Sequence, residues 1–388
     1  MTELHVSDAI RYVGVDDTTI DLFESQYPVP NGVSYNSYVI LDEKVAVMDT
    51  VDRRAAPDWL ENLEAELKGR APDYLVIQHL EPDHAGSIGL LAERYPNMTL
   101  VGNAKTFSML PKFFPALAAA PALTVKEGDT LPLGSHTLTF VMAPMVHWPE
   151  VMVSYESCEK VLFSADGFGT FGALSAGQSW EKEAARYYFN IVGKYGAQVQ
   201  ALLKKAAGLD IRTICPLHGP VLRENLGFYL DKYDRWSRYE PEEKDAVLVA
   251  FATIHGNTAQ AAGKMKEILE RRGCGRVALV DLCREDQAVA VEEAFRCGKL
   301  VAMSPTYDGG LFPAMDHFMA HLRDKTYRSR TVALIENGSW APSAAKHMRA
   351  YLEAMKDVTI CPTVHTIQGA VKEADVAAME RIADEVLA

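Results

Sequence analysis

The stretch HLEPDHAG, residues 79–86, places two histidines and two carboxylates around a proline. Pro82 excludes an ordinary helix interior, because proline lacks a backbone N–H and its ring clashes with the preceding turn. Four side chains able to hold a metal ion are therefore gathered where regular structure is interrupted. The third residue of the stretch, Glu81, is the one that indicates which metal and which chemistry.

Further potential ligands stand at the ends of three apolar runs later in the chain. MVHWPE supplies His147, FSADGFG supplies Asp166 and CPLHGP supplies His218. Side chains at the ends of strands are how α/β folds present their chemistry. Four of the chain's 11 histidines fall in the combined set. The candidate metal ligands, which are also the candidate catalytic residues, are His79, Glu81, Asp83, His84, His147, Asp166 and His218.

The spacing of these residues predicts two metal ions rather than one. His79 and Glu81 are two positions apart and point the same way in an extended chain. Residues after the proline bend can face a second metal, and the carboxylate of Asp166 can bridge the two. We expect each metal to have two imidazoles and two carboxylates. The two sets are His79, Glu81, His147 and Asp166 for one, and Asp83, His84, His218 and Asp166 for the other.

The identity of the residue at position 81 favours redox chemistry over hydrolysis. The ordered ligand set resembles that of the metallo-β-lactamase fold, with one change. Hydrolytic members of that fold have H-x-H-x-D-H, which gives one metal three neutral imidazoles and suits zinc and its bound water. Glu81 makes both sites two-histidine sites with carboxylates, and oxygen and nitrogen ligands without thiolate are typical of non-haem iron. Ligand types alone leave zinc and manganese open.

The second half of the chain has a different pattern. A charged break, YEPEEKD (239–245), precedes five apolar runs that alternate with helical stretches, a pattern typical of a parallel sheet wound on both faces. The first half instead mixes a hairpin, VSYNSYVILDEKVAVMDTV (33–51), with further strands and a long helical stretch at 184–209. We place the domains at residues 1–243 and 244–388.

Three loops of the second half resemble a flavin mononucleotide site. Backbone N–H groups where a helix begins after Gly256 suit a phosphate without lysine or arginine. Tyr307 and Trp340 can each cover a flat ring, although turn aromatics also pack on ordinary surfaces. The candidate FMN-binding residues are Thr253, Ile254, His255, Gly256, Asn257 and Thr258; Ser304, Pro305, Thr306, Tyr307, Asp308, Gly309 and Gly310; and Glu336, Asn337, Gly338, Ser339 and Trp340.

These motifs together resemble the flavodiiron proteins, or A-type flavoproteins. The resemblance implies an N-terminal metallo-β-lactamase-like αββα sandwich and a C-terminal flavodoxin-like domain with a doubly wound, five-stranded parallel sheet. It implies two non-haem irons on the seven ligands, FMN on the three loops, and reduction of dioxygen to water, of nitric oxide to nitrous oxide, or both. It also implies a head-to-tail homodimer, or a dimer of dimers, and an external donor such as rubredoxin, reduced deazaflavin or a flavin reductase.

Two positions depart from the family pattern without removing a ligand. His255 precedes Gly256 where many relatives have an aromatic or small residue, and Val151 follows HWPE where several carry a hydroxyl.

Two alternative functions remain open at this stage. A metallo-β-lactamase-type hydrolase leaves Glu81 and the flavin loops unexplained, and a non-catalytic electron carrier leaves the complete ligand set unexplained.

Composition excludes several classes of partner. The formal net charge of −13 argues against nucleic acid or an anionic membrane as the main partner. The N-terminus lacks the pattern of a signal peptide, and no run of about 18 apolar residues occurs. The six scattered cysteines contain no C-x-x-C pair. They suggest a reducing cytoplasm, and no built-in rubredoxin or iron–sulfur module.

Overall fold

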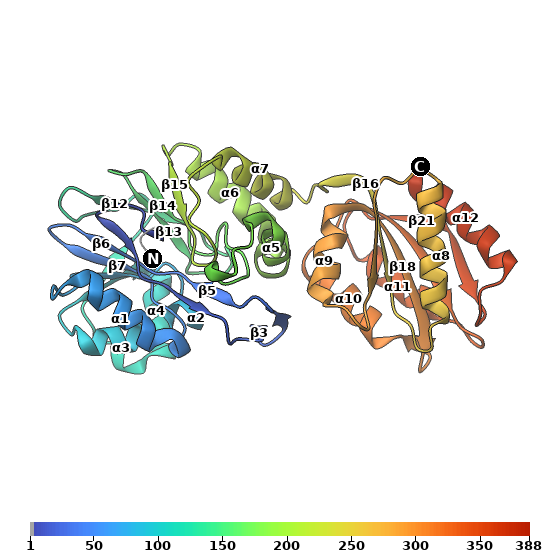
Figure 1. Cartoon of the computed structure of the whole chain (residues 1–388), viewed down its shortest axis with the longest axis horizontal. Helices are drawn as coiled ribbons and strands as arrows, with labels where there is room; N and C mark the ends of the chain where they lie inside the picture. Colours follow the sequence, from blue (N-terminus) through green and yellow to red (C-terminus); the bar gives the residue numbers. More distant parts are fainter. Residues whose placement is uncertain (1–3) are drawn as a thin grey trace. The chain divides into compact units, whose positions relative to one another are not determined.

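The computed structural model describes residues 4–388, which divide into two compact units (Figure 1). The first unit extends to Tyr188 and resumes at Tyr195–Asp234. The second comprises Phe189–Lys194 and Arg235–Ala388. Residues 235–243, which we had placed with the first domain, are thus grouped with the second unit, as is the short segment 189–194.

The first unit contains two facing sheets, as expected for a sandwich. One sheet has six strands, and its β6–β7 hairpin turns at Asp42 and Glu43 as the sequence predicted. In spatial order its strands are β1 (Ile10–Tyr12), β6 (Tyr38–Leu41), β7 (Val45–Met48), β8 (Tyr74–Val76), β9 (Thr99–Asn103) and β10 (Ala122–Val125). β7 through β10 run parallel to one another.

The other sheet of this unit has five strands and completes the core. Its strands, in order, are β11 (Thr130–Pro132), β12 (Thr137–Met142), β13 (Met152–Glu156), β14 (Val161–Phe163) and β15 (Thr213–Cys215). Ile40 and Met48 of the six-stranded sheet share one buried apolar cluster with Phe140 and Phe163 of this sheet. Two small ribbons lie outside, β2 (Val15–Asp17) with β5 (Val33–Tyr35) and β3 (Leu22–Phe23) with β4 (Tyr27–Pro28).

Helices surround the two sheets. α1 and α4 contact strands of the six-stranded sheet, and α6 and α7 border an apolar cavity over β13 and β14. The helices are α1 (Ala56–Leu67), α2 (Pro82–Ala85), α3 (Ile88–Arg94), α4 (Ala104–Phe113), α5 (Trp180–Tyr187), α6 (Gly196–Ala206) and α7 (Leu226–Ser237), with 3-10 turns at Arg53–Ala55, Pro115–Leu117 and Leu174–Ala176.

The helical stretch predicted at 184–209 is not continuous. α5 ends at Tyr187, a π-helix occupies Tyr188–Val192, a 3-10 turn follows at Gly193–Tyr195, and α6 begins at Gly196. Two glycines within four positions lower the helical preference of this stretch, and single-turn π segments relieve such a break. Apolar periodicity predicted the helices but not the change of hydrogen-bonding pattern between them.

The second unit confirms the predicted parallel sheet. Its order is β17 (Val277–Asp281), β16 (Glu243–Phe251), β18 (Cys297–Tyr307), β20 (Thr331–Asn337) and β21 (Thr359–Ile367), and every neighbouring pair is parallel. The short β19 (Gly310–Leu311) pairs antiparallel with the end of β18. Because β16 lies between β17 and β18, the chain order reverses there, which is where doubly wound sheets bind ligands.

Helices cover both faces of this sheet (Figure 1). α8 (Asn257–Arg271) and α12 (Glu373–Leu387) contact each other on one face, while α10 (Pro313–Asp324) contacts both α9 (Gln287–Arg296) and α11 (Ala344–Glu353) on the other. Val249 and Val301 of the strands pack with Met265 of α8 in one buried cluster. The parallel strands therefore deliver the loops after β16, β18 and β20 to a single edge.

Within residues 4–388, none of the helices has both the length and the apolar character needed to cross a membrane.

The stability of the second unit should respond to pH through His321 on α10. Burial lowers the pKa of His321 to about 4, and the nearby charges of His317 and Lys325 act in the same direction. The unfolded chain therefore binds a proton at this residue between about pH 6.5 and pH 4 that the folded chain does not bind, so stability falls as pH falls through that window. We expect His321→Gln to lose less stability than the wild type between pH 7 and pH 5, measured by urea unfolding. An equal loss in both proteins would contradict this assignment.

Candidate metal centre

The local backbone of HLEPDHAG separates its ligands into two directions. His79 and Leu80 follow β8, and Glu81 is extended, with φ −60° and ψ 136°. Glu81 is the N-cap of α2, and Pro82 occupies the first helical position, where proline is well tolerated. Asp83 and His84 therefore lie on a helical turn while His79 and Glu81 lie on extended chain. This is the bend that the sequence predicted at the proline.

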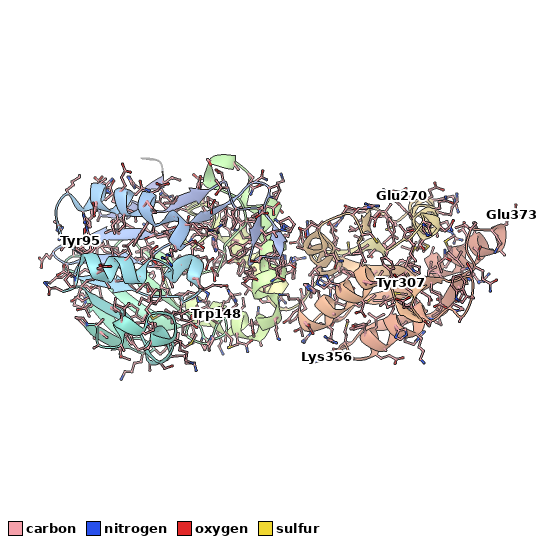
Figure 2. All side chains as sticks on the ribbon, turned by 90° about the horizontal axis from the view of Figure 1, so that it is seen from below. Tyr95, Trp148, Glu270, Tyr307, Lys356 and Glu373 are labelled. Carbon is pink, nitrogen blue, oxygen red and sulfur yellow. The ribbon has the colours of Figure 1, made fainter. Side chains whose placement is uncertain are left out.

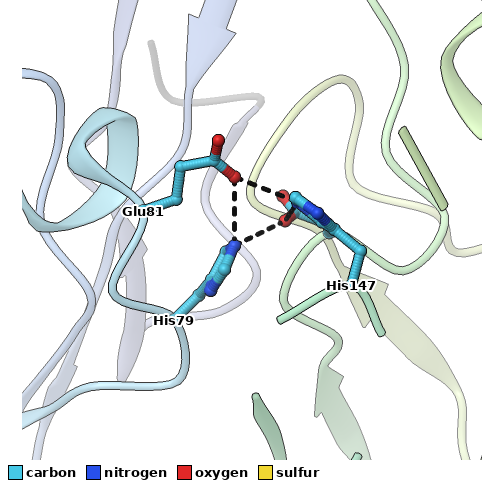
Figure 3. A group of neighbouring side chains, drawn as sticks. His79, Glu81 and His147 are labelled. Atoms are coloured by element: carbon cyan, nitrogen blue, oxygen red, sulfur yellow. Dashed lines mark hydrogen bonds and ion pairs between the residues drawn. The ribbon is translucent and has the colours of Figure 1, made fainter. Parts of the chain in front are cut away.

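The first group of ligand atoms comprises His79, Glu81, His147 and Asp166. Glu81 Oε2 lies 3.2 Å from His79 Nε2 and 3.0 Å from His147 Nε2. Figure 3 shows His79 and Glu81 of one segment and His147 of another converging on one point. Asp166 Oδ2 lies 3.2 Å from His79 Nε2 and 3.3 Å from His147 Nε2. One ligand atom from each of the four residues fits within 4.8 Å of the others.

The second group comprises Asp83, His84 and His218, and Asp166 reaches it with its other oxygen. Asp83 Oδ2 lies 3.3 Å from His84 Nε2 and 3.1 Å from His218 Nε2. Asp166 Oδ1 lies 3.1 Å from His84 Nε2 and 3.8 Å from His218 Nε2. All seven predicted ligands are thus brought together, and the two oxygens of Asp166 face the two groups separately.

The spacing within these groups fits bound cations. Ligand atoms that share a metal ion about 2.1 Å away lie about 3.0–3.4 Å apart. Two of the buried atoms facing the centre, His147 Nε2 and Asp166 Oδ2, lack a hydrogen bond among the residues described. Buried polar atoms without a hydrogen bond are costly, and a metal ion at the first group would satisfy both. The donor set of oxygen and nitrogen fits iron, as the sequence suggested.

Outer hydrogen bonds fix which imidazole nitrogen faces the centre. His79 Nδ1 lies 2.8 Å from Glu150 Oε1, and His218 Nδ1 lies 2.7 Å from the carbonyl oxygen of Ser34. A histidine whose Nδ1–H is donated to an acceptor presents a lone pair on Nε2, which is how metal-binding histidines are usually oriented. Glu150 was not among the predicted site residues, although it follows Pro149 only three positions after His147.

Neighbouring charges shift the pKa values of the buried ligand side chains. Burial opposes the charged form of His147, but the adjacent carboxylates of Asp166 and Glu81 outweigh it and raise the pKa of His147 to about 9. Burial likewise opposes ionisation of Asp166, while the neighbouring His84, His147 and His79 hold its pKa well below the usual range. The carboxylates are therefore ionised near neutral pH, and this buried pocket favours positive charge.

The centre opens to one side through its carboxylates. A pocket of about 520 Å³ is lined by Glu81, Pro82 and Asp83 and by residues such as Tyr35 and Arg54. The side chains of Glu81 and Asp83 are 15% and 12% exposed, whereas His79, His84 and His218 are fully buried. Trp148, labelled in Figure 2, covers another side: its ring is edge-on to His79 at 5.3 Å and stacked on Phe113.

The second unit has a separate pocket of about 390 Å³ at the edge that its parallel strands share. Most of the residues predicted to bind FMN line it, and the lining contains no lysine or arginine, as the sequence led us to expect. These residues are Thr253, Ile254, His255, Asn257, Thr258, Pro305, Thr306, Asp308, Gly309, Asn337, Gly338, Ser339 and Trp340. Trp340 is 82% exposed and Ile254 is 45% exposed, so apolar side chains stand free at its rim.

Five predicted residues do not line this pocket. Ser304 and Glu336 lie at buried strand ends, and the Glu336 carboxylate instead accepts hydrogen bonds from Ala345 N–H and the Thr366 hydroxyl. Tyr307 packs edge-on against Phe312. Gly256 and Gly310 shape the turns: Gly256 has a φ of +93° as the N-cap of α8, a conformation that favours glycine.

The sequence reasoning missed two lining residues, Ala341 and Gly369. Gly369 follows β21, and its backbone exchanges two hydrogen bonds with the Asn337 side chain, at 2.9 and 3.1 Å. The available signal was a glycine directly after the fifth apolar strand, since every strand of a parallel sheet ends at the same edge. The loop after β21 thus adds a fourth segment to the pocket.

Comparison with known proteins supports this architecture over the whole chain. Residues 33–219 match the family described as ODP family beta lactamase. A nitric oxide reductase of Moorella thermoacetica is 28% identical, over 94% of this chain and 92% of the relative. The solved structure of rubredoxin oxygen:oxidoreductase from Desulfovibrio gigas has a TM-score of 0.93 at 26% identity, over 98% of this chain and 97% of the other. The flavodiiron protein from Giardia intestinalis gives 0.91 at 27%, over 98% and 95%.

Over nearly its whole length the chain is similar to flavodiiron proteins. The protein is an oxidoreductase with a metallo-β-lactamase-like unit followed by a flavodoxin-like unit, as the resemblance implied. Of the two departures from the family pattern, His255 lines the pocket of the second unit. Val151 is buried at the start of β13 and has no polar side-chain atom to contribute there.

Removing the outer partner of His79 should weaken metal binding. Glu150→Ala leaves all seven ligands but deletes the acceptor of His79 Nδ1–H, and loss of such a partner typically costs about 10- to 100-fold in metal affinity. Glu150→Gln retains an acceptor oxygen and should fall between the two. The measurement is metal retained after dialysis against graded chelator, with the surface change Glu127→Ala as control. Retention equal to the wild type in Glu150→Ala would show that the outer hydrogen bond is dispensable.

Proposed function

We propose that this protein reduces dioxygen to water, nitric oxide to nitrous oxide, or both, at two non-haem irons supplied with electrons through FMN. The irons are assigned to His79, Glu81, Asp83, His84, His147, Asp166 and His218, and FMN to the pocket of the second unit. One observation carries the proposal: two histidine–carboxylate groups share a buried aspartate whose two oxygens face them separately.

The protein's own residues would balance the charge of the irons and fix the positions of their ligands. Iron would supply electrons directly to a small gas, and FMN would receive them singly or in pairs from a donor and pass them on. Asp166 fixes the distance between the two groups, while Glu150 and Ser34 orient His79 and His218 by their hydrogen bonds. Trp148 shields one side, and access is left through the pocket at Glu81 and Asp83.

The flavin phosphate is assigned to the beginning of α8. The first backbone N–H groups of a helix have no partner within the helix and lie at the positive end of its dipole. The hydroxyls of Thr253 and Thr258 and the amide of Asn257 line the same pocket. Asn337, fixed by Gly369, and the exposed indole of Trp340 stand at the part of the pocket suited to a flat ring.

The proposal also covers the electron donor and the oligomeric state. Rubredoxin, reduced deazaflavin or a flavin reductase are candidate donors, and the name of the Desulfovibrio gigas relative pairs that enzyme with rubredoxin. A head-to-tail homodimer, or a dimer of dimers, would bring the flavin of one subunit to the irons of another. The six cysteines are free thiols, which suits a reducing compartment such as the cytoplasm.

A hydrolase of the metallo-β-lactamase type is disfavoured. Glu81 lies within 3.2 Å of His79 and His147 and occupies the position where hydrolytic members have an imidazole. A hydrolase would also leave unexplained a pocket of about 390 Å³, without lysine or arginine, at the ligand-binding edge of the second unit.

The first test is composition and gas specificity. We expect the purified protein to be yellow and to contain two irons and one FMN per chain, measured by metal analysis and by the flavin released on denaturation. After anaerobic reduction, stopped-flow mixing with each gas separately should reoxidise the protein with dioxygen, nitric oxide or both. Stoichiometric zinc with little iron would overturn the redox assignment.

The second test is Glu81→His, which recreates the hydrolytic ligand pattern. Because this change replaces a carboxylate with a neutral imidazole, it should shift the bound metal towards zinc and abolish gas reduction. The readouts are the iron-to-zinc ratio after growth in medium containing both metals, and reoxidation by each gas. Glu61→His, on the exposed face of α1, is the matched control. Full gas reduction by Glu81→His would refute the argument from ligand type.

A further inference from the structure

A second group of metal-binding side chains lies at the opposite end of the β12–β13 hairpin from His147. His136 directly precedes β12, Glu156 is the last residue of β13, and Cys158 and Glu159 lie in the turn before β14. The strand register brings them together: Leu138 is opposite Glu156, and Ser157 N–H donates to the carbonyl oxygen of Thr137. The six residues of β12 span roughly 20 Å, so this group is separate from the diiron ligands.

The donor atoms of this group are close enough to share one ion. One imidazole nitrogen of His136, one carboxylate oxygen of Glu156 and the sulfur of Cys158 lie within 4.8 Å of one another. His136 Nε2 also lies 3.2 Å from Glu159 Oε1. That spacing equals the distance between His79 Nε2 and Glu81 Oε2 in the first metal group.

His136 is oriented like the metal-facing histidines of the diiron centre. Its Nδ1 lies 2.8 Å from Asp42 Oδ2, which also accepts the backbone N–H of His136 at 2.7 Å. This repeats the pairing of His79 with Glu150 and leaves Nε2 directed at the turn that holds Glu159. An imidazole fixed by a carboxylate in this way is the usual outer arrangement of a metal-binding histidine.

The charge of the group calls for a cation. Glu156 is fully buried, and its carboxylate accepts only the backbone N–H groups of Cys158 and Glu159, each at 2.7 Å. Within residues 4–388 no lysine or arginine forms an ion pair with Glu156 or Glu159; Glu159 meets His136 and accepts a hydrogen bond from the Ser7 hydroxyl. A buried carboxylate without a cation is costly.

We propose that His136, Glu156, Cys158 and Glu159 form a third metal site, which takes a divalent ion of the zinc type. One sulfur, one nitrogen and two carboxylate ligands suit tetrahedral Zn²⁺, whereas a thiolate is a poor ligand for Mg²⁺ or Ca²⁺. The site ties the start of β12 to the β13–β14 turn and has a structural role, remote from the gas. The proposal does not depend on the function assigned to the diiron centre.

The competing explanation is that His136 is simply a protonated imidazole between two carboxylates. Burial opposes that charge, but hydrogen bonds to Asp42 and Glu159 raise the pKa of His136. In that case Cys158 would have no part in the group. The thiol therefore decides between the two explanations, and it is accessible to reagents because Cys158 is exposed.

The experiment uses the iron- and flavin-containing protein and adds Zn²⁺ or Co²⁺ alone. The diiron ligands include no thiolate, so a thiolate-to-cobalt absorption band in the difference spectrum would report only a cysteine site. We expect one equivalent of Co²⁺ to produce this band and one equivalent of Zn²⁺ to remove it. Zn²⁺ should also slow alkylation of Cys158 by about tenfold or more, because a bound thiolate is no longer a free nucleophile.

Three variants complete the test. Cys158→Ser should abolish the band, while Cys274→Ser, which changes a partly exposed thiol elsewhere, should leave it intact. Asp42→Asn retains every proposed ligand and should weaken Zn²⁺ binding by about 10- to 100-fold. Absence of the band in the wild type, or an equal band in Cys158→Ser, would overturn the proposal, as would alkylation of Cys158 at the same rate with and without Zn²⁺.

Discussion

The constraint on which the first unit depends is the concentration of buried negative charge around Asp166. This carboxylate is almost completely buried, and with Glu81 and Asp83 it meets four imidazoles within a few ångströms. Protons or metal ions must balance that charge, since ionised carboxylates are not otherwise stable in an apolar interior. The two sheets meet this requirement by ending their strands and loops at one place, so that residues from three distant segments, 79–84, His147 and His218, converge on the carboxylate of Asp166.

Much of this arrangement was predictable from the sequence because the ligands are marked by local interruptions. His79 and Glu81 could be assigned to one direction, and Asp83 and His84 to another, because Pro82 forces the change from extended chain to helix. The five parallel strands of the second unit could be predicted equally well, since each contains an apolar run bounded by turn residues. The outer partners were not: Glu150 is an ordinary carboxylate in the sequence, and only the fold places it 2.8 Å from His79.

The parts that sequence reasoning missed share a physical cause, which is dependence on contacts between segments far apart in the chain. The position of Gly369 after a strand pointed to this edge of the sheet, but its pairing with Asn337, 32 residues earlier in the chain, is encoded by no local pattern. Ser304 and Glu336 were assigned to the ligand although their strands bury them, because the last residue of a strand and the first of a loop look alike in sequence. The π-helix at Tyr188–Val192 likewise could not be predicted from apolar periodicity.

The lack of lysine and arginine in the pocket of the second unit has a consequence for how a cofactor would be retained there. Without lysine or arginine, a phosphate at the start of α8 would be held by short-range donors rather than by mobile cationic side chains. Interactions of that kind are buried by the ligand itself and are screened only weakly by dissolved ions. Occupancy would therefore be nearly insensitive to ionic strength, so a phosphate-bearing ligand would be retained at high salt concentration.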